Sequence, residues 1–434
     1  MTPLSAALLR LLPAFLLLLA AAERGFAQSD YSDALALQGR LAVSLAQARE
    51  VEAALGQLLV VNVDGFGYSG PLALEPSFAP MITRLRIGGV IPHYGSTSYE
   101  RIRRTNRALA GLTDLPLLIC SDIVKLRAGA RTASFGDGYV GGFLGRYRPM
   151  RDDQLATLAR LNAFVLTALG VNVSLGPTVD SSTRDPRTVE RARLAVDELR
   201  GYGLQAVLKH FPFLPSAANL HQESPDTKLS LDQVQKRFAV FGDLADSADL
   251  LMTTHLFDTA VDDSLVTFSR KWNGLLRERT GYRGLLMTDG LLMLRNYADR
   301  RPLAGGVPPG DFAGLDAAAS WAARAILAGH DLVIVEGSAA QTVRVFEGLL
   351  AAACGGTSAD RALRERILES SARIVRWKKD RESDLRRTVE VPPQDIARVI
   401  QLLPADDADL AAFRFDPAAL SRIQARLEST ALPR

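Results

Sequence analysis

The chain has 434 residues, of which 47% are hydrophobic and 23% charged, with 34 glycines and 21 prolines among them. This composition is near the globular average and excludes a collagen-like, coiled-coil or largely disordered chain. Lysine and arginine total 51 against 48 aspartates and glutamates, a formal net charge of +3, so no excess of positive charge indicates a nucleic acid partner. The two cysteines, Cys120 and Cys354, form no Cys-x-x-Cys or Cys/His cluster, so the sequence indicates neither a disulfide framework nor a zinc site.

The first segment, residues 1–27, has the pattern of a cleavable export signal. Arg10 supplies a positive charge, an apolar run follows it, and the small-x-small sequence GFA ends at Ala27. The run is shorter than the roughly 20 residues that a membrane-spanning helix needs. We therefore expect an exported protein, periplasmic or extracellular, without a stable membrane span after cleavage. The alternative is an uncleaved anchor, because Glu23 and Arg24 follow the run closely.

Beyond about residue 40, short apolar runs alternate with longer helical segments. Runs that are apolar on both faces favour parallel strands buried between a core and covering helices. Eight such runs occur, at 58–63, 89–93, 117–122, 171–176, 206–210, 250–254, 285–288 and 332–335. Crossover helices are expected between them, for example at 99–110, 152–169 and 188–202. The pattern predicts an α/β fold, a (β/α)8 TIM-type barrel within residues 28–338, with a doubly wound open sheet as the alternative.

The last part of the chain, residues 339–434, predicts a helical C-terminal extension that packs on the barrel. It is rich in Ala, Leu and Arg, with a long candidate helix at 361–379 and a break at the two prolines that follow, 392–393. Cofactors are not expected, because the first strand turn, VDGFG at 63–67, lacks the third glycine of the dinucleotide fingerprint and no Walker loop occurs. No metal is expected either, since no HExxH or His-x-His pair is present.

Polar residues gather where the predicted strands end. In a TIM-type barrel the carboxyl ends of the strands face the active-site mouth. The residues at these ends are Asp64, His93, Asp122, Asp180, Lys209, His210, His255 and Asp289, and His221 lies in the loop after the fifth strand. A single histidine is as well explained by a hydrogen-bonded role near the core. The cluster, rather than any one member, therefore indicates a site.

Three of these residues allow more specific expectations. Asp289 ends the strand sequence GLLMTD, and a carboxylate held rigidly in this way can act as a nucleophile or stabilise a cationic transition state. The alternative is that it caps the next helix. Lys209 and His210 are neighbours in a strand, so their side chains should point to opposite faces unless a bulge turns both toward the mouth. Turned together they could bind sugar hydroxyls or an acidic group.

Seven fragments in barrel order resemble glycoside hydrolase family 3, in particular its single-barrel β-N-acetylhexosaminidase branch. They extend over about residues 50–337 and are QLLV with DG (57–65), GGVI (88–91), PLLICSD (116–122), LGPTVD (175–180), LKHFP (208–212), MTTH (252–255) and MTD (287–289). The resemblance implies a retaining hydrolase that cleaves a β-linked amino sugar, with Asp289 as nucleophile and His221 as acid/base. It also implies a carbohydrate partner, bound by Asp122, Lys209 and His210. Further candidates to bind substrate are Asp64, His255 and Arg184.

The loop that carries His221 differs from the family pattern. FLP at 213–215 stands where the family has Gly-His-Gly, and Asn219 replaces the aspartate that orients the histidine. Proline fixes its backbone where glycine would allow the loop to close, and a neutral amide cannot stabilise an imidazolium as a carboxylate does. The alternative function is therefore a catalytically impaired family member that acts as an envelope glycan-binding or scaffold protein. A third hypothesis is a metal-dependent barrel hydrolase with the ligands Asp64, His93 and His255.

Overall fold

Eight parallel strands close into a barrel in the computed structural model of the protein. The structure describes residues 30–62, 77–92, 94, 96–136, 151–179, 187–214, 226–296 and 316–403, with positions 418, 421, 422 and 425. The ring order is β1, β2, β4, β7, β8, β10, β12 and β13, and β13 pairs with β1 to close it. The predicted (β/α)8 barrel is thus confirmed, and the doubly wound sheet is excluded because an open sheet would have two edges.

The barrel strands lie where the apolar runs predicted them. Their bounds are β1 (Leu59–Asn62), β2 (Gly89–Ile91), β4 (Leu118–Ser121), β7 (Val173–Ser174), β8 (Gln205–Phe211), β10 (Leu250–Thr253), β12 (Leu285–Gly290) and β13 (Leu332–Val335). All residues of these strands are buried except His210 and Asp289. Burial on both faces explains why the strands have continuous apolar runs instead of alternating patterns.

Within the described ranges, eight helices cover the outside of the ring, one after each strand. They are α4 (Phe78–Leu85), α5 (Tyr99–Ala110), α7 (Asp152–Ala168), α8 (Thr188–Gly201), α9 (Leu231–Asp243), α10 (Arg270–Thr280), α11 (Ala317–Leu327) and α12 (Ala339–Ala353). Serine side chains begin several of them by accepting a backbone N–H, as Ser98 does for α5 and Ser338 for α12. Because α12 packs against α11 and α4, the ring of helices continues past residue 338, where the sequence analysis ended the barrel.

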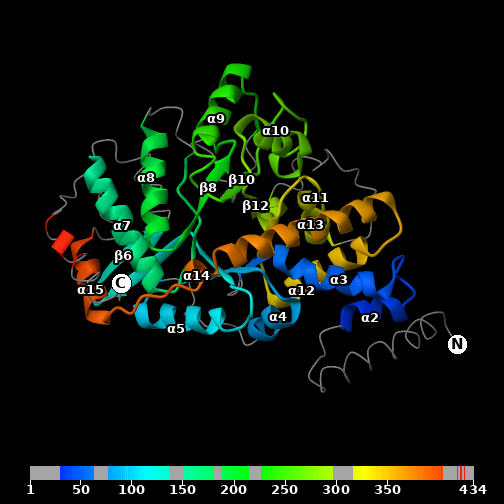
Figure 1. The fold of residues 1–434 in the computed structure, drawn as a ribbon, viewed down its shortest axis with the longest axis horizontal. Coiled ribbons are helices and arrows are strands. Elements are labelled where there is room, and N and C mark those ends of the chain that lie inside the picture. Colours follow the sequence, from blue (N-terminus) through cyan, green and yellow to red (C-terminus); the bar gives the residue numbers. More distant parts are fainter. Residues whose placement is uncertain are drawn as a thin grey trace.

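Further helices stand before and after the ring, namely α2 (Asp30–Leu37), α3 (Leu45–Leu55), α13 (Ser358–Asp380), α14 (Glu382–Leu385) and α15 (Pro393–Leu402). The long helix α13, orange in Figure 1, packs against α3, α11 and α12. It is fastened to the amino-terminal end of the barrel at Asp331, which directly precedes β13 and is fully buried. Arg366 Nη2 and Arg373 Nη1 of α13 each lie 3.0 Å from Asp331 Oδ1. Within the described residues, the chain after the ring is therefore helical, as predicted, and ion-paired to the barrel.

A hairpin that the sequence analysis did not predict begins directly after Asp122. Strands β5 (Ile123–Ala128) and β6 (Arg131–Gly136) pair antiparallel and join β3 (Ser96–Thr97) in a three-stranded sheet. Helix α15 packs against this sheet, and Arg131 of β6 donates hydrogen bonds to the carbonyls of Gln401 and Leu403 at the end of α15. A second pair, β9 (Asp226–Thr227) and β11 (Phe257–Asp258), and the 3-10 helices η1 (Gly56–Leu58), η2 (Val266–Phe268) and η3 (Leu291–Asn296) complete the described elements.

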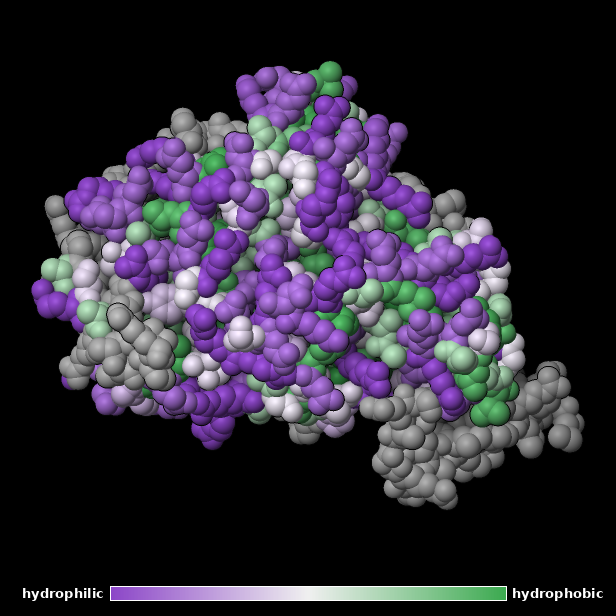
Figure 2. All heavy atoms as spheres, in the orientation of Figure 1, coloured by the Kyte–Doolittle hydropathy of each residue, from purple (hydrophilic) through white to green (hydrophobic). Residues whose placement is uncertain are grey.

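The surface in Figure 2 is mainly hydrophilic, with apolar side chains in small separate patches. Among the described residues, the large hydrophobic side chains classed as exposed are Leu37, Ile123 and Leu231. Within the same residues, no helix has the length and hydropathy to cross a bilayer. The expected export signal, residues 1–27, lies outside the described residues.

Candidate active site

The two strand residues that escape full burial lie beside each other at the carboxyl end of the barrel. His210 of β8 and Asp289 of β12 retain side-chain exposures of 13% and 18%, and His210 Nε2 lies 3.9 Å from Asp289 Oδ2. Both stand in the last two residues of their strands. Because TIM-type barrels carry their active sites at this end, the pair marks the candidate active site.

A β-bulge at the end of β12 sets the position of Asp289. Met287 pairs with Leu332 and Gly290 with Ile334, so two residues of β12 stand opposite one residue of β13. Thr288 Oγ1 accepts the N–H of Ile334 at 3.0 Å, which supplies a partner where the ladder is interrupted. Such an extra residue bends the strand and redirects its side chains. It leaves Asp289 partly exposed at the end of an otherwise buried strand.

A second bulge explains the neighbouring pair Lys209 and His210. Leu208 pairs with Leu251 and Phe211 with Thr253, so two residues of β8 stand opposite one residue of β10. Lys209 Nζ lies 2.6 Å from Asp122 Oδ1, while His210 approaches Asp289. Of the two arrangements that the sequence left open, the structure has the bulge, and both side chains engage carboxylates of the mouth.

The electrostatics of the mouth favour an ionised Asp289. Burial raises the pKa of the Asp289 carboxyl, but the nearby His210 and His255 side chains and the Gly290 N–H lower it, and the net effect is a pKa below the ordinary value. The Gly290 N–H donates to Asp289 Oδ1 at 2.7 Å. A carboxylate that is ionised, hydrogen-bonded and fixed at a barrel mouth can act as a nucleophile or stabilise positive charge.

His255 lies behind this carboxylate, and its side chain has no exposed surface. Its Nε2 is 2.8 Å from the Gly290 carbonyl oxygen, which can only accept, so Nε2 carries a proton. Burial lowers the His255 pKa, and Nδ1 lies 2.7 Å from Thr267 Oγ1. The expectation that His255 binds substrate stays a prediction. Both nitrogens are used by the protein, and the ring supports the peptide that holds Asp289.

Several residues expected in the site cannot be placed beside this pair, because they lie outside the described residues. They are Asp64, His93, Asp180, Arg184 and the acid/base candidate His221. Among the described residues, no group of three His, Cys, Asp or Glu side chains is arranged to hold a metal ion. Cys120 and Cys354 are both buried free thiols.

Sequence analysis missed two residues that contact the site. Gly290 supplies both the N–H for Asp289 and the carbonyl for His255. Glu336 follows β13 directly, retains 8% exposure and accepts the N–H of Leu292. The rule that polar residues at strand ends face the mouth also applies to strand eight, so applying it there would have found Glu336.

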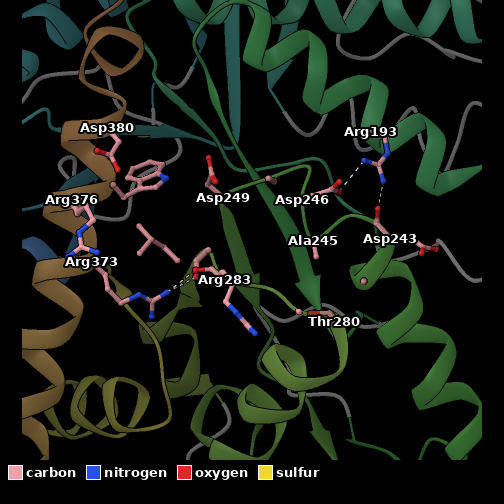
Figure 3. A pocket seen from close by; sticks show the side chains of 16 residues that line it. Arg193, Asp243, Ala245, Asp246, Asp249, Thr280, Arg283, Arg373, Arg376 and Asp380 are labelled. Carbon is pink, nitrogen blue, oxygen red and sulfur yellow. Dashed lines mark hydrogen bonds and ion pairs between the residues drawn. The ribbon is translucent and has the colours of Figure 1, made fainter.

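A cavity of about 700 Å³ lies at the other end of the barrel. Asp249 and Leu285, which begin or precede β10 and β12, form part of its wall, and Arg373, Arg376 and Asp380 of α13 form another part (Figure 3). The dashed lines in Figure 3 join Arg193 to Asp246 and to the Asp243 carbonyl, and Arg373 to the carbonyls of Arg283 and Gly284. Because this end of a TIM-type barrel serves stability, we assign the cavity to the boundary between extension and barrel.

The barrel has its counterpart among known proteins. The model of the glycosyl hydrolase family 3 N-terminal domain matches residues 50–376. The chain belongs to this family. A β-hexosaminidase of Tolumonas auensis is 27% identical over 286 residues, 61% of this chain and 79% of that protein. A β-hexosaminidase of Bordetella pertussis is 31% identical over 238 residues, 48% of this chain and 65% of that protein.

Solved structures of family 3 proteins share the fold. A family 3 β-N-acetylglucosaminidase from Paenibacillus sp. FPU-7 has a TM-score of 0.58 at 21% identity, covering 86% of this chain and 68% of that chain. A β-N-acetylhexosaminidase from Beutenbergia cavernae has a TM-score of 0.55 at 20% identity, covering 76% of this chain and 98% of that chain. At these identities the likeness establishes the fold alone. The chemistry of this family member must be argued from its own mouth residues.

Proposed function

We propose that the protein is a retaining glycoside hydrolase that removes a β-linked N-acetylhexosamine, with Asp289 as its nucleophile. The observation that carries the proposal is the partly exposed Asp289, ionised beside His210 at the mouth of an otherwise buried barrel. Membership of family 3 and the β-hexosaminidases among its relatives support this reaction and substrate class.

In this mechanism Asp289 attacks the anomeric carbon as the glycosidic C–O bond breaks. The leaving oxygen takes a proton from a general acid, and a covalent glycosyl ester forms on Asp289. Water, deprotonated by the same acid/base group, then attacks the anomeric carbon and breaks its bond to the Asp289 oxygen, which releases the sugar with retained configuration and frees the carboxylate. We propose His221 for the acid/base role, because an imidazole can give and take a proton near neutral pH.

The sugar would be held by the groups around the nucleophile. Asp122 keeps 49% of its side chain exposed while one oxygen pairs with Lys209, so its other oxygen can accept a sugar hydroxyl. His210 lies close enough to Asp289 to contact a sugar bound there. Lys209, itself 7% exposed, fixes the Asp122 carboxylate, because a charge-assisted hydrogen bond is stronger than a neutral one.

We further propose that the substrate is an amino-sugar glycan outside the cytosol, such as cell-wall material. The export pattern of residues 1–27 supports this location. The alternative, a glycan-binding or scaffold protein without turnover, is favoured by two features of the loop that carries His221, the FLP sequence at 213–215 and Asn219.

Release of p-nitrophenol from an N-acetylglucosaminide separates the two functions. Asp289→Asn should lower kcat by roughly 10³-fold or more, because the amide is not a nucleophile. The matched control is Asp246→Asn, the same change at an exposed carboxylate of the opposite end, which should retain wild-type kcat. Equal, near-zero rates in wild type and Asp289→Asn, with retained binding of N-acetylglucosamine oligosaccharides, would instead favour the glycan-binding function.

A further inference from the structure

Glu336 places a third carboxylate near the mouth, one to which neither the mechanism nor the family resemblance gives a role. It stands directly after β13, next to the bulged end of β12, and is 92% buried, with 8% exposure. Its Oε2 accepts the Leu292 N–H at 3.1 Å. Leu292 lies in the first turn of η3, where backbone N–H groups have no partner within the helix. Glu336 therefore anchors the chain three residues after the nucleophile.

The same carboxylate lies against Gly290. A β-carbon at position 290 would come within 2.5 Å of the Glu336 carboxyl carbon and 2.6 Å of Oε2, closer than real contacts allow. Gly290 is not among the glycines with positive φ, so it is space, and not backbone conformation, that requires glycine here. The Glu336 carboxylate thus occupies the volume that any side chain at 290 would need.

Gly290 is consequently held on three sides. Its N–H donates to Asp289, its carbonyl accepts from His255, and its Cα face packs on Glu336. We propose that Glu336 is a positioning residue for the nucleophile, fixing the turn from Gly290 to Leu292 so that the Gly290 N–H stays directed at Asp289 Oδ1. This inference rests on the proposed function, because it assigns Glu336 a part in the same reaction.

The mechanism of positioning predicts which substitutions are tolerated. Glutamine at 336 keeps the shape and an oxygen that can accept the Leu292 N–H. Alanine removes both, leaves a buried N–H without a partner, and opens space beside Gly290. The loss of one such hydrogen bond corresponds to roughly a tenfold effect or more when the released segment carries the reacting group.

The experiment compares Glu336→Gln, Glu336→Ala, Gly290→Ala and the double variant Gly290→Ala/Glu336→Ala with p-nitrophenyl N-acetylglucosaminide. We expect Glu336→Gln to stay within about 3-fold of wild-type kcat, and Glu336→Ala to lose about 10-fold or more in kcat with little change in KM. Gly290→Ala should be more damaging alone than in the Glu336→Ala background, because the shortened side chain makes room for the new methyl group.

The matched control is Asp331→Asn at the other end of the same strand pair. Asp331 Oδ2 accepts the Leu286 N–H at 3.0 Å, as Glu336 accepts the Leu292 N–H. The Asp331 contact, however, lies at the amino-terminal end of β12, away from the mouth. This variant should lower stability and leave kcat and the pH profile unchanged. Equal activities of Glu336→Gln and Glu336→Ala, or strictly additive effects at 290 and 336, would overturn the inference.

The inference and the proposed function can fail separately. If the wild-type protein hydrolyses no N-acetylhexosaminide, the proposed function fails, and the contact is then tested by the urea midpoints of the wild type, Gly290→Ala, Glu336→Ala and the double variant. Gly290→Ala should lower the midpoint less in the Glu336→Ala background than in wild type. Equal decreases would show that Glu336 does not confine Gly290.

Discussion

Lys378 of α13 allows a quantitative prediction about how the extension is joined to the barrel. The residue is 1% exposed, and its Nζ donates to Gln57 Oε1 at 3.0 Å and to the Gly88 carbonyl at 2.7 Å. Gln57 and Gly88 precede β1 and β2, so the Lys378 side chain enters the amino-terminal end of the barrel. Burial lowers the Lys378 pKa from 10.5 to about 7. The neighbouring Cys120 thiol, whose pKa burial raises to about 12, stays neutral over this range.

The sign of the pH effect follows from proton linkage. Between pH 7 and 10.5 the unfolded chain binds a proton at Lys378 that the folded protein has largely lost, so the free energy of unfolding rises with pH. The cost of burying the lysine is RT ln[(1+10^(10.5−pH))/(1+10^(7−pH))], which gives about 4 kcal/mol at pH 7 and about 1 kcal/mol at pH 9.5. Lys378 should thus make the protein about 3 kcal/mol more stable at the higher pH.

Lys378→Met removes this titration while keeping the unbranched side chain. Its effect at one pH combines the lost charge with two unsatisfied acceptors, each worth about 1 to 3 kcal/mol, so the informative quantity is the change with pH. Urea unfolding followed by far-UV circular dichroism at pH 7 to 9.5 should show wild type gaining about 3 kcal/mol relative to the variant. The control is Lys379→Met, at the exposed next residue. Its free energy of unfolding should change with pH in the same way as that of wild type. If the free energy of unfolding of Lys378→Met also changed with pH as that of wild type does, the lowered pKa of the buried Lys378 would be refuted.

The remaining predictions concern the mouth. Lys209→Met should raise KM about 10-fold or more with a smaller change in kcat, since Asp122 loses the cation that holds it; an unchanged KM in initial-rate assays would exclude that role. The acid limb of kcat/KM against pH should lie below the ordinary aspartate pKa, because His210, His255 and the Gly290 N–H outweigh burial at Asp289, and a limb above that value would contradict this balance. His255→Leu should lower kcat about 10-fold with KM nearly constant, because the Gly290 carbonyl loses its donor.

The barrel could be predicted from the sequence because its strands are buried on both faces and therefore appear as apolar runs of consecutive residues. The bulges could not, since each depends on pairing with a neighbouring strand, and yet they decide where Lys209, His210 and Asp289 point. The sequence also could not distinguish a rim histidine from a buried one. His255 follows its strand like the others, but the carbonyl of Gly290, 35 residues away, fixes it inside.

The hairpin β5–β6 and the buried Lys378 escaped prediction for a related reason. The alternation in IVKLRA becomes recognisable as a strand only once α15 covers its buried face, and α15 comes from the far end of the chain. Lys378 stands in the sequence WKKD, where either lysine could face solvent. Which one is buried depends on the axial rotation of α13 against the barrel, and tertiary packing alone sets that rotation.

The attachment of α13 to Asp331 has a consequence for synthesis. Asp331 has three arginine partners, of which Arg277 precedes it in the chain and Arg366 and Arg373 follow it. A nascent chain that has just emerged through strand eight would bury this carboxylate with only Arg277 beside it, a costly state in a low-dielectric interior. The barrel should therefore reach its final stability only after α13 has been released, so chains stopped before residue 358 should be preferred substrates for proteases.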